Sequence, residues 1–243
     1  MRIPRIYLSQ PLNTGNEVEL DSTALRHVVQ VLRLKAGHPL ILFNGNGGEF
    51  EAKLVNVEKR QATVRIGSFH DISRESSLIT HLGLGISKGE RMDIALQKAV
   101  ELGVSQITPL FTEHCVVQLT GSRALKKQEH WQAVIISACE QSGRNSIPAL
   151  NSVGTFNDWL SRIQAATKLI LDPEASTALS MIKLQKPELA MTVGPEGGFS
   201  QAEIEQARLA GFQGVTLGPR VLRTESAALA SLAAVQCLWG DLA

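Results

Sequence analysis

The sequence predicts an α/β protein of two domains, in which a small β-barrel precedes a larger domain with a mostly parallel sheet and helices on both faces. The first 70 residues carry short strand patterns joined by Asn-Gly and Gly-Gly turns. Further along, apolar strands alternate with helical patterns, which is typical of a parallel sheet. Between the two parts, the stretch His70–Ser77 is polar and lacks apolar periodicity. We therefore expect domains at residues 1–72 and 73–243.

The N-terminal domain is expected to hold one helix among its strands. A helix over Ser22–Leu34 is predicted because Asp21 or Ser22 can cap its start and apolar residues recur on one face. The run Asn44–Gly48 separates two apolar segments and predicts a hairpin. The expected strands are Arg5–Ser9, Pro39–Asn44, Gly48–Val57 and Gln61–Ile66.

The C-terminal domain shows a regular order of strands and helices. Its expected strands are Ile79–Ile86, Ile107–Phe111, Lys168–Leu171, Leu189–Val193 and Val215–Leu217. Its expected helices are Glu90–Leu102, Ala124–Gln141, Ser200–Ala210 and Glu225–Leu238. The last of these is apolar or small nearly all round, which indicates packing against the sheet and against another chain as well.

Composition narrows the class of protein. The chain is 44% hydrophobic and 19% charged, which is typical of a globular protein. Its net charge of +1 disfavours nucleic-acid binding over the whole surface and allows only a local basic face. No apolar run is long enough to span a membrane, and the start Met1–Arg5 lacks a signal-peptide core. The three cysteines are scattered, so we expect reduced thiols, a cytoplasmic location and no membrane partner. The histidines show no ligand spacing, and we expect no metal.

Two glycine-rich turns are the most informative segments. They read GPEGGFS at Gly194–Ser200 and LGPRVLRTE at Leu217–Glu225, and each follows a short apolar strand. Glycines after a strand let the backbone approach a ligand closely, so the two turns predict one pocket walled by backbone. Ser200 and Glu203 form the pattern of a capping box, which fixes a helix start after the first turn. The patterns GxGxxG and GxxxxGK[ST] are absent, which disfavours a nucleotide-phosphate site.

Taken together, the two turns resemble the signature of the SPOUT superfamily of methyltransferases. The likeness continues over nearly the whole chain, and it is similar in particular to the RsmE-type 16S ribosomal RNA (uracil-N3)-methyltransferases. The segments that extend it are MRIPRIY at 1–7, HVVQVLR at 27–33, KGERM at 88–92, KAVELGV at 98–104 and EQSGR at 140–144. The resemblance implies a PUA-like RNA-binding β-barrel followed by a SPOUT domain with a deep trefoil knot. It also implies S-adenosylmethionine as methyl donor, a homodimer with the site at its interface, and a uridine of 16S ribosomal RNA in the assembled small subunit as substrate.

The resemblance places the cofactor in the loops that follow three strands. S-adenosylmethionine needs a slot of backbone groups and apolar side chains rather than a phosphate cradle. The residues that we expect to hold it are Leu171, Gly194, Gly198, Leu217 and Leu222. The chain has Asp172 where the family often has His, so no catalytic role is transferred to that position.

Methylation of uracil N3 requires removal of a proton and stabilisation of negative charge on the uracil oxygens. Glu196 and Glu225 are candidate bases. Glu196 could instead tie its loop through backbone N–H groups, and Glu225 could merely favour a helix start. Arg220, Arg223 and Arg144 are the candidate partners of the developing charge or of an RNA phosphate.

Basic residues are expected to hold the RNA phosphates, since the chain has few aromatic side chains for base stacking. The residues that we assign to RNA contact are Arg2, Arg5, Arg26, Arg33, Lys88, Arg91 and Arg144.

Two other functions stay open at this point. The chain could be a non-catalytic RNA-binding factor of ribosome assembly on the same fold, which S-adenosylmethionine binding would distinguish. It could also be an α/β enzyme for another adenine-containing ligand such as NAD, against which the missing GxGxxG pattern counts.

Overall fold

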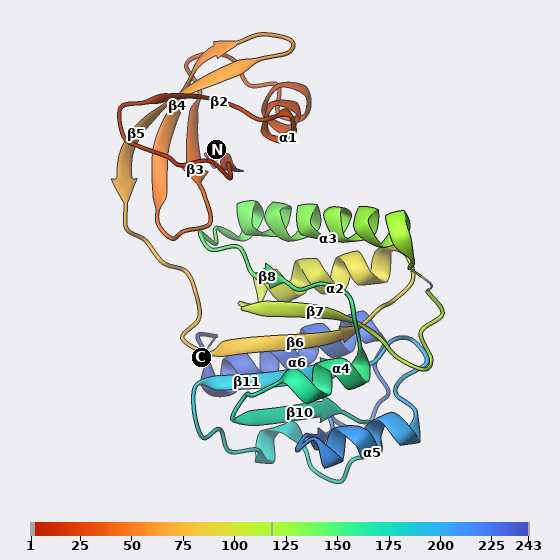
Figure 1. Ribbon diagram of the computed structural model, residues 1–243. Helices are drawn as coiled ribbons and strands as arrows, with labels where there is room; N and C mark the ends of the chain where they lie inside the picture. The colour runs from red at the N-terminus through yellow and green to blue at the C-terminus, as the bar shows by residue number, and fades with distance from the viewer. Residues whose placement is uncertain (1–2, 118, 243) are drawn as a thin grey trace. The chain divides into compact units, whose positions relative to one another are not determined.

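The computed structural model describes residues 3–117 and 119–242, and the chain forms two compact units (Figure 1). Unit 1 consists of Met1–Glu75 and Cys139–Ile147, and unit 2 consists of Ser76–Ala138 and Pro148–Ala243. The chain returns to unit 1 after part of unit 2, so a single boundary in the sequence does not separate the two units. The boundary after residue 72 stays a prediction.

Unit 1 is built on a five-stranded sheet in the order β1-β3-β4-β5-β2. The strands are β1 (Arg5–Tyr7), β2 (Glu17–Glu19), β3 (Pro39–Phe43), β4 (Glu49–Val57) and β5 (Ala62–His70). β1 pairs with β3 in parallel, and the other neighbours are antiparallel. The hairpin predicted at Asn44–Gly48 joins β3 to β4, and Gly45, Gly47 and Gly48 adopt positive φ there. Alternate residues of these strands fill the core of the unit.

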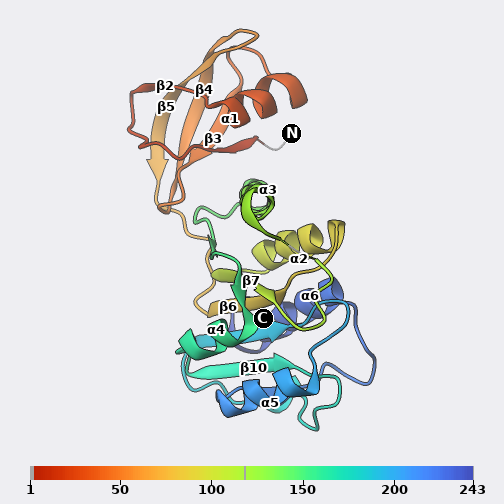
Figure 2. The same ribbon diagram turned by 45° about the vertical axis from the view of Figure 1, so that its right-hand side comes forward.

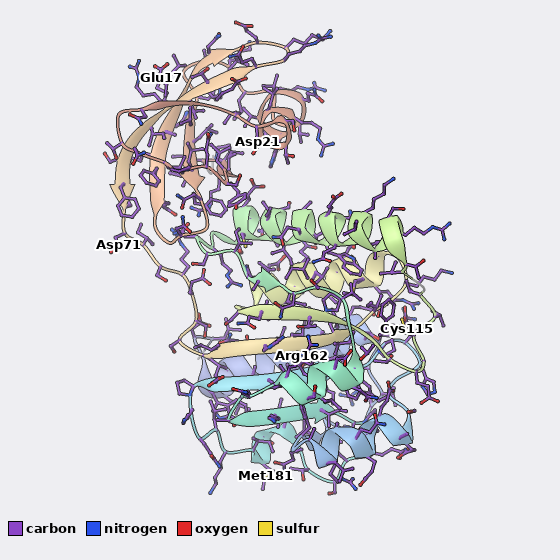
Figure 3. All side chains as sticks on the ribbon, in the orientation of Figure 1. Glu17, Asp21, Asp71, Cys115, Arg162 and Met181 are labelled. Carbon is purple, nitrogen blue, oxygen red and sulfur yellow. The ribbon has the colours of Figure 1, made fainter. Side chains whose placement is uncertain are left out.

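The helix of unit 1 begins where the sequence predicts and then changes type. α1 spans Ser22–Leu25, and Asp21, labelled in Figure 3, caps it by accepting two backbone N–H bonds of 2.9 Å. From Arg26 to Val31 the chain continues as a π-helix, η1, so the α-helix expected over Ser22–Leu34 is wrong beyond its first turn.

The π-helical turn separates two valines that an α-helix would keep nearer one face. The Leu32 N–H donates to the His27 carbonyl at 2.9 Å, which closes the wider turn. Val28 is fully buried, whereas Val31 is 65% exposed. Arg33 ends the helix at φ 53°, and it is the only non-glycine residue with positive φ in the described part of the chain.

Unit 2 is built on a seven-stranded sheet in which every pairing is parallel. The order is β12-β10-β11-β6-β7-β8, and β9 also pairs with β7. The strands are β6 (Ile79–Gly85), β7 (Gln106–Phe111), β8 (Ala149–Leu150), β9 (Gly154–Thr155), β10 (Thr167–Leu171), β11 (Glu188–Val193) and β12 (Gln213–Val215). The parallel sheet predicted from the alternation of strands and helices is confirmed.

Helices cover both faces of this sheet (Figures 1 and 2). They are α2 (Glu90–Glu101), α3 (Gly121–Ser142), α4 (Phe156–Arg162), α5 (Gln201–Leu209) and α6 (Thr224–Trp239), with a short 3-10 helix η2 (Leu179–Met181). α2 packs against α6 on one face, and α4 packs against α5 on the other. Phe156 and Trp159 of α4 join Phe212 and strand residues in a buried apolar cluster. α4 is not among the helices expected from the sequence, because a helix of two turns carries too few apolar repeats to stand out.

Candidate functional site

Three loops of unit 2 leave the carboxyl ends of neighbouring strands β10, β11 and β12 and line one pocket. They contribute residues 171–174, 193–199 and 215–218, and the pocket has a volume of about 590 Å³. Parallel α/β sheets bind their ligands at the carboxyl ends of the strands. Small-molecule sites typically enclose about 300 to 1,000 Å³, so this pocket has both the position and the size of a ligand site.

The pocket brings together most of the residues that the sequence assigns to cofactor and catalysis. Those expected to hold the cofactor all line it, namely Leu171, Gly194, Gly198, Leu217 and Leu222. Of the expected catalytic residues, Glu196, Arg220 and Arg223 also line it, whereas Glu225 does not. The roles themselves stay predictions.

The first glycine-rich turn needs its glycines at two points. Gly198 adopts φ +69°, and its N–H donates to the Pro195 carbonyl at 2.9 Å. A Cβ on Gly194 would lie 3.1 Å from the Gly198 carbonyl carbon. The two glycines therefore close a tight turn whose backbone forms the pocket wall.

Glu196 ties this turn to the loop after β6. Its Oε1 accepts the Lys88 backbone N–H at 3.0 Å and pairs with the Arg91 guanidinium at 3.1 Å. Partial burial raises the pKa of the Glu196 carboxyl, but backbone N–H groups and Arg91 outweigh this effect and hold the pKa below its ordinary value. A carboxylate held in this way is a weakened base, and the arrangement favours the loop-tying role of Glu196.

Glu203 joins the same turn to the loop after β7. The capping box predicted at the start of α5 is confirmed: Glu203 N–H donates to Ser200 Oγ, and Ser200 N–H donates to Glu203 Oε2 at 2.9 Å. The second oxygen, Oε1, accepts the Glu113 N–H at 2.9 Å. One buried carboxylate thus bridges the loops that follow β11 and β7.

The loop after β7 also supports the turn directly. His114 Nδ1 donates to the Gly197 carbonyl oxygen at 2.9 Å, since a carbonyl oxygen can only accept. A Cβ on Gly197 would lie 2.6 Å from the His114 Cβ, which only glycine avoids. Cys115, labelled in Figure 3, extends this contact with a 3.5 Å bond from its thiol to the Ile86 carbonyl.

The second glycine-rich turn places two cations on the pocket. Arg220 and Arg223 are exposed, and no ion pair or hydrogen bond engages either side chain within the described residues. Arg223 occupies the N-cap position of α6 without a side-chain cap bond, and Thr224 is the first helical residue. Glu225 follows in the first turn of α6, and its Oε2 is buried without a hydrogen-bond partner.

Asp172 is a pocket residue to which the sequence analysis gave no role. It follows β10 directly, lines the pocket and is 9% exposed. Its Oδ1 accepts the Glu174 N–H at 2.9 Å, which is an Asx turn. An Asp-Pro pair after a predicted strand is the signal from which this turn could have been found.

The basic residues assigned to RNA divide into two groups. Arg26, Arg33, Lys88 and Arg91 are exposed. Arg5 and Arg144 are buried, and their guanidinium groups pair with Glu49 and Glu75 inside unit 1. These two side chains are thus engaged within unit 1, and their assignment to RNA contact stays a prediction. Arg2 lies outside the described residues.

Residues 3–117 and 119–242 contain neither a candidate metal cluster nor a candidate membrane-spanning helix. No cluster of three His, Cys, Asp or Glu side chains there could hold a metal ion. No helix in those ranges combines the length and apolarity that crossing a membrane requires.

The site can bind an apolar, adenine-sized group between backbone walls and present guanidinium groups at its rim. The chain matches two family models: an RNA methyltransferase domain over residues 74–236 and an RNA methyltransferase PUA domain over residues 20–67. These matches cover both units.

Relatives match over almost the full length. The chain is 36% identical over 242 residues to the ribosomal RNA small subunit methyltransferase E of Buchnera aphidicola subsp. Schizaphis graminum, covering 99% of this chain and 98% of the relative. It is 34% identical to the enzyme of the same name from Bacillus subtilis, covering 91% of this chain and 88% of the relative.

Two solved structures share the whole fold. One is a methyltransferase of Legionella pneumophila with bound S-adenosylmethionine, at TM-score 0.97 and 44% identity with full coverage of both chains. The other is the ribosomal RNA small subunit methyltransferase E of Neisseria gonorrhoeae bound to S-adenosylmethionine, at TM-score 0.92 and 41% identity, again with full coverage of both.

Proposed function

This chain belongs to the ribosomal RNA small subunit methyltransferase E family, and on that premise we propose that it methylates N3 of one uridine in 16S ribosomal RNA with S-adenosylmethionine. The observation that carries the proposal is the pocket at the ends of β10, β11 and β12, which gathers every residue expected to hold the cofactor. The bound S-adenosylmethionine of the two solved relatives supports the same assignment. The assembly-factor alternative is not favoured, because the relatives are methyltransferases by name.

The residues present suit S-adenosylmethionine. The pocket of about 590 Å³ is large enough, the Gly194 and Gly198 backbone forms a wall that a Cβ at Gly194 would disturb, and Leu171, Leu217 and Leu222 supply apolar sides. When bound, the cofactor supplies an activated methyl group. The protein has to hold the uracil in line with it and exclude water.

Arg220 and Arg223 are proposed to face the uracil oxygens, where negative charge grows as N3 loses its proton. Their side chains have no other partner in the described part of the chain, so binding substrate breaks no existing ion pair. Glu196 is engaged with Lys88 and Arg91. Glu225 is the other candidate base; it does not line the pocket of the single chain, but its Oε2 is buried without a hydrogen-bond partner, so it is the carboxylate to test as proton acceptor.

RNA contact is proposed for the exposed basic residues Arg26 and Arg33 of unit 1 and Lys88 and Arg91 of unit 2. Phosphate contacts of this kind orient the RNA without reading its sequence. We propose the assembled small subunit as substrate, since few exposed aromatic side chains are available to hold single bases and a particle supplies a fixed shape.

We also propose that the protein is a homodimer, that its chain forms a trefoil knot and that it is located in the cytoplasm. α6 is nearly all apolar or small, yet it leaves Leu229 38% and Leu238 45% exposed. A second copy that covers these side chains would remove apolar surface from water. The cytoplasmic location follows from a substrate that resides in bacterial ribosomes.

The test uses small subunits from cells that lack the enzyme, incubated with the purified protein and S-adenosylmethionine. Methylation at N3 blocks base pairing, so primer extension along the 16S RNA is expected to stop at one uridine. Free 16S RNA is the comparison and is expected to react poorly. No stop on either substrate, with tight RNA binding retained, would contradict the proposal and restore the assembly-factor reading.

A further inference from the structure

Asp172 is the one carboxylate of the pocket that is nine-tenths buried, with 9% of its surface exposed. It stands directly after β10, between Leu171 and the pair Pro173-Glu174, all of which line the same pocket. The other pocket carboxylates, Glu174 and Glu196, are exposed. Asp172 is therefore largely shielded from solvent although it lines the pocket.

The two oxygens of Asp172 differ. Oδ1 accepts the Glu174 N–H at 2.9 Å, which fixes the orientation of the carboxylate. Oδ2 has no hydrogen-bond partner among the described residues. Gly214 of β12 lies beside this oxygen, since a Cβ added to that glycine would lie 3.7 Å from Oδ2. Oδ2 is not one of the buried polar atoms left without a partner, so part of its surface is accessible, and a ligand or water in the pocket can supply the missing hydrogen bond.

From this arrangement we infer that Asp172 is a cofactor-binding residue, and that its free oxygen accepts a hydrogen bond from the ribose hydroxyl groups of the adenosine half of the ligand. The inference rests on the proposed function, because it takes S-adenosylmethionine as the ligand of this pocket.

Two considerations select the ribose. Leu171, Leu217 and Leu222 line the same pocket and suit the flat apolar adenine, so the sugar attached to it lies within reach of the loop after β10. A carboxylate at the carboxyl end of a parallel strand is also the group with which dinucleotide-binding folds recognise ribose hydroxyls. Here the same chemistry arises without a glycine fingerprint, from an Asx turn that engages one oxygen of a pocket-lining aspartate and leaves the other without a protein partner.

The experiment measures ligand affinity by calorimetry in the full chain and in Asp172→Asn. In this variant Oδ1 still accepts the Glu174 N–H, and an uncharged amide group replaces the charged acceptor. The change matters because charge-assisted hydrogen bonds are about twice as strong as neutral ones. The ligands are S-adenosylmethionine, 5′-methylthioadenosine, which lacks the amino-acid half, and its 2′,3′-dideoxy derivative, which lacks both hydroxyls. Asp71→Asn, an exposed carboxylate of unit 1 labelled in Figure 3, is the matched control.

The inference predicts that Asp172→Asn weakens S-adenosylmethionine and 5′-methylthioadenosine by a similar factor, on the order of tenfold. It predicts no further loss for the dideoxy compound, because the partner hydroxyls are already absent. Thermal unfolding of the ligand-free variant should match that of Asp71→Asn.

Three results would overturn the inference. Unchanged affinity for all ligands would remove any role in binding. A loss confined to S-adenosylmethionine would move the contact to the amino-acid half. A loss that persists for the dideoxy compound would exclude the hydroxyls. A wild-type protein that binds none of the three would contradict the proposed function as well, so the two failures are distinguishable.

Discussion

Arg220 and Arg223 are the pocket residues whose side chains are best placed to act on a substrate rather than on the cofactor. Both are exposed and neither makes an ion pair within the described residues. We expect Arg220→Ala and Arg223→Ala each to lower the methylation rate about a hundredfold, the usual effect of removing one donor from developing negative charge.

Affinity for S-adenosylmethionine is expected to survive both arginine changes, as measured by calorimetry. Arg208→Ala, on the exposed face of α5, is the control and should leave both quantities unchanged. If cofactor binding falls as far as the rate does, the arginines only support their loop.

His81 belongs to a buried polar network away from the pocket. Its Nε2 accepts hydrogen bonds from Trp159 Nε1 at 3.3 Å and from Thr108 Oγ1 at 2.7 Å. Burial lowers the pKa of the imidazole from 6.5 to about 4. The folded protein therefore holds His81 neutral at pH values where the unfolded chain binds a proton.

This shift sets the sign of a pH effect on stability. Between pH 6.5 and about 4 the unfolded state holds more protons at His81, so the free energy of unfolding falls as the pH falls through this window. The contribution is complete above pH 6.5 and amounts to roughly 3 kcal/mol at most. Urea unfolding across this range should be less pH-dependent in His81→Asn than in the wild type, and identical slopes would contradict the assignment.

At the scale of elements, the loops after β6, β7 and β11 act as one support for the pocket wall. Glu203 is central because its two oxygens accept N–H groups from Ser200 and Glu113. In Glu203→Gln one of these acceptors becomes an NH₂ group that faces a donor. We expect the dissociation constant for S-adenosylmethionine to rise about tenfold, the effect of one unsatisfied buried group.

Glu205→Gln is the matched control, since it makes the same change on an exposed position of α5. It should bind the cofactor like the wild type. Equal affinities in both variants would show that the pocket wall keeps its shape without the Glu203 bridge.

Some of these elements could be predicted from the sequence, and others could not. The capping box at Ser200 and the longer strands of unit 2 could be predicted because they depend on local chemistry and on apolar runs, whereas β8 and β9, of two residues each, were not predicted. The change from α1 to a π-helix at Arg26 could not, because no local preference separates the two helix types. The bridge from Glu203 to Glu113 joins residues 90 positions apart, and only the fold brings them together.

At the scale of the whole molecule, residues 139–147 belong to unit 1 although they lie far along the chain. Within that unit, Arg5 bonds the Asn145 side chain, and Glu75 pairs with Arg144. The sequence predicts RNA contact for Arg5 and Arg144, but it does not reveal that both side chains have partners within unit 1. Burial and ion pairing become visible only in three dimensions.

The proposed dimer gives a prediction for the assembled molecule. Leu229→Glu places a charge on the exposed apolar part of α6, and we expect it to dissociate the dimer, as measured by sedimentation velocity. Leu209→Glu, at a position of α5 that is 81% exposed, should stay dimeric. A wild-type protein that sediments as a fully active monomer at micromolar concentration would contradict the shared interface.

The central claim is that the glycine-rich turn after β11 forms the wall of an S-adenosylmethionine pocket. Gly198 has φ +69° with open space where a Cβ would stand, and Gly211 has φ +85° with equally open surroundings but lies outside the pocket. Valine at either position imposes a similar backbone strain. Gly211→Val therefore shows how far a loss of stability alone affects cofactor binding.

The measurement is a calorimetric titration of the wild type, Gly198→Val and Gly211→Val with S-adenosylmethionine. We expect the wild type and Gly211→Val to bind, and Gly198→Val to lose detectable binding. Binding by Gly198→Val as tight as that of the wild type, or no binding by the wild type, would contradict the account.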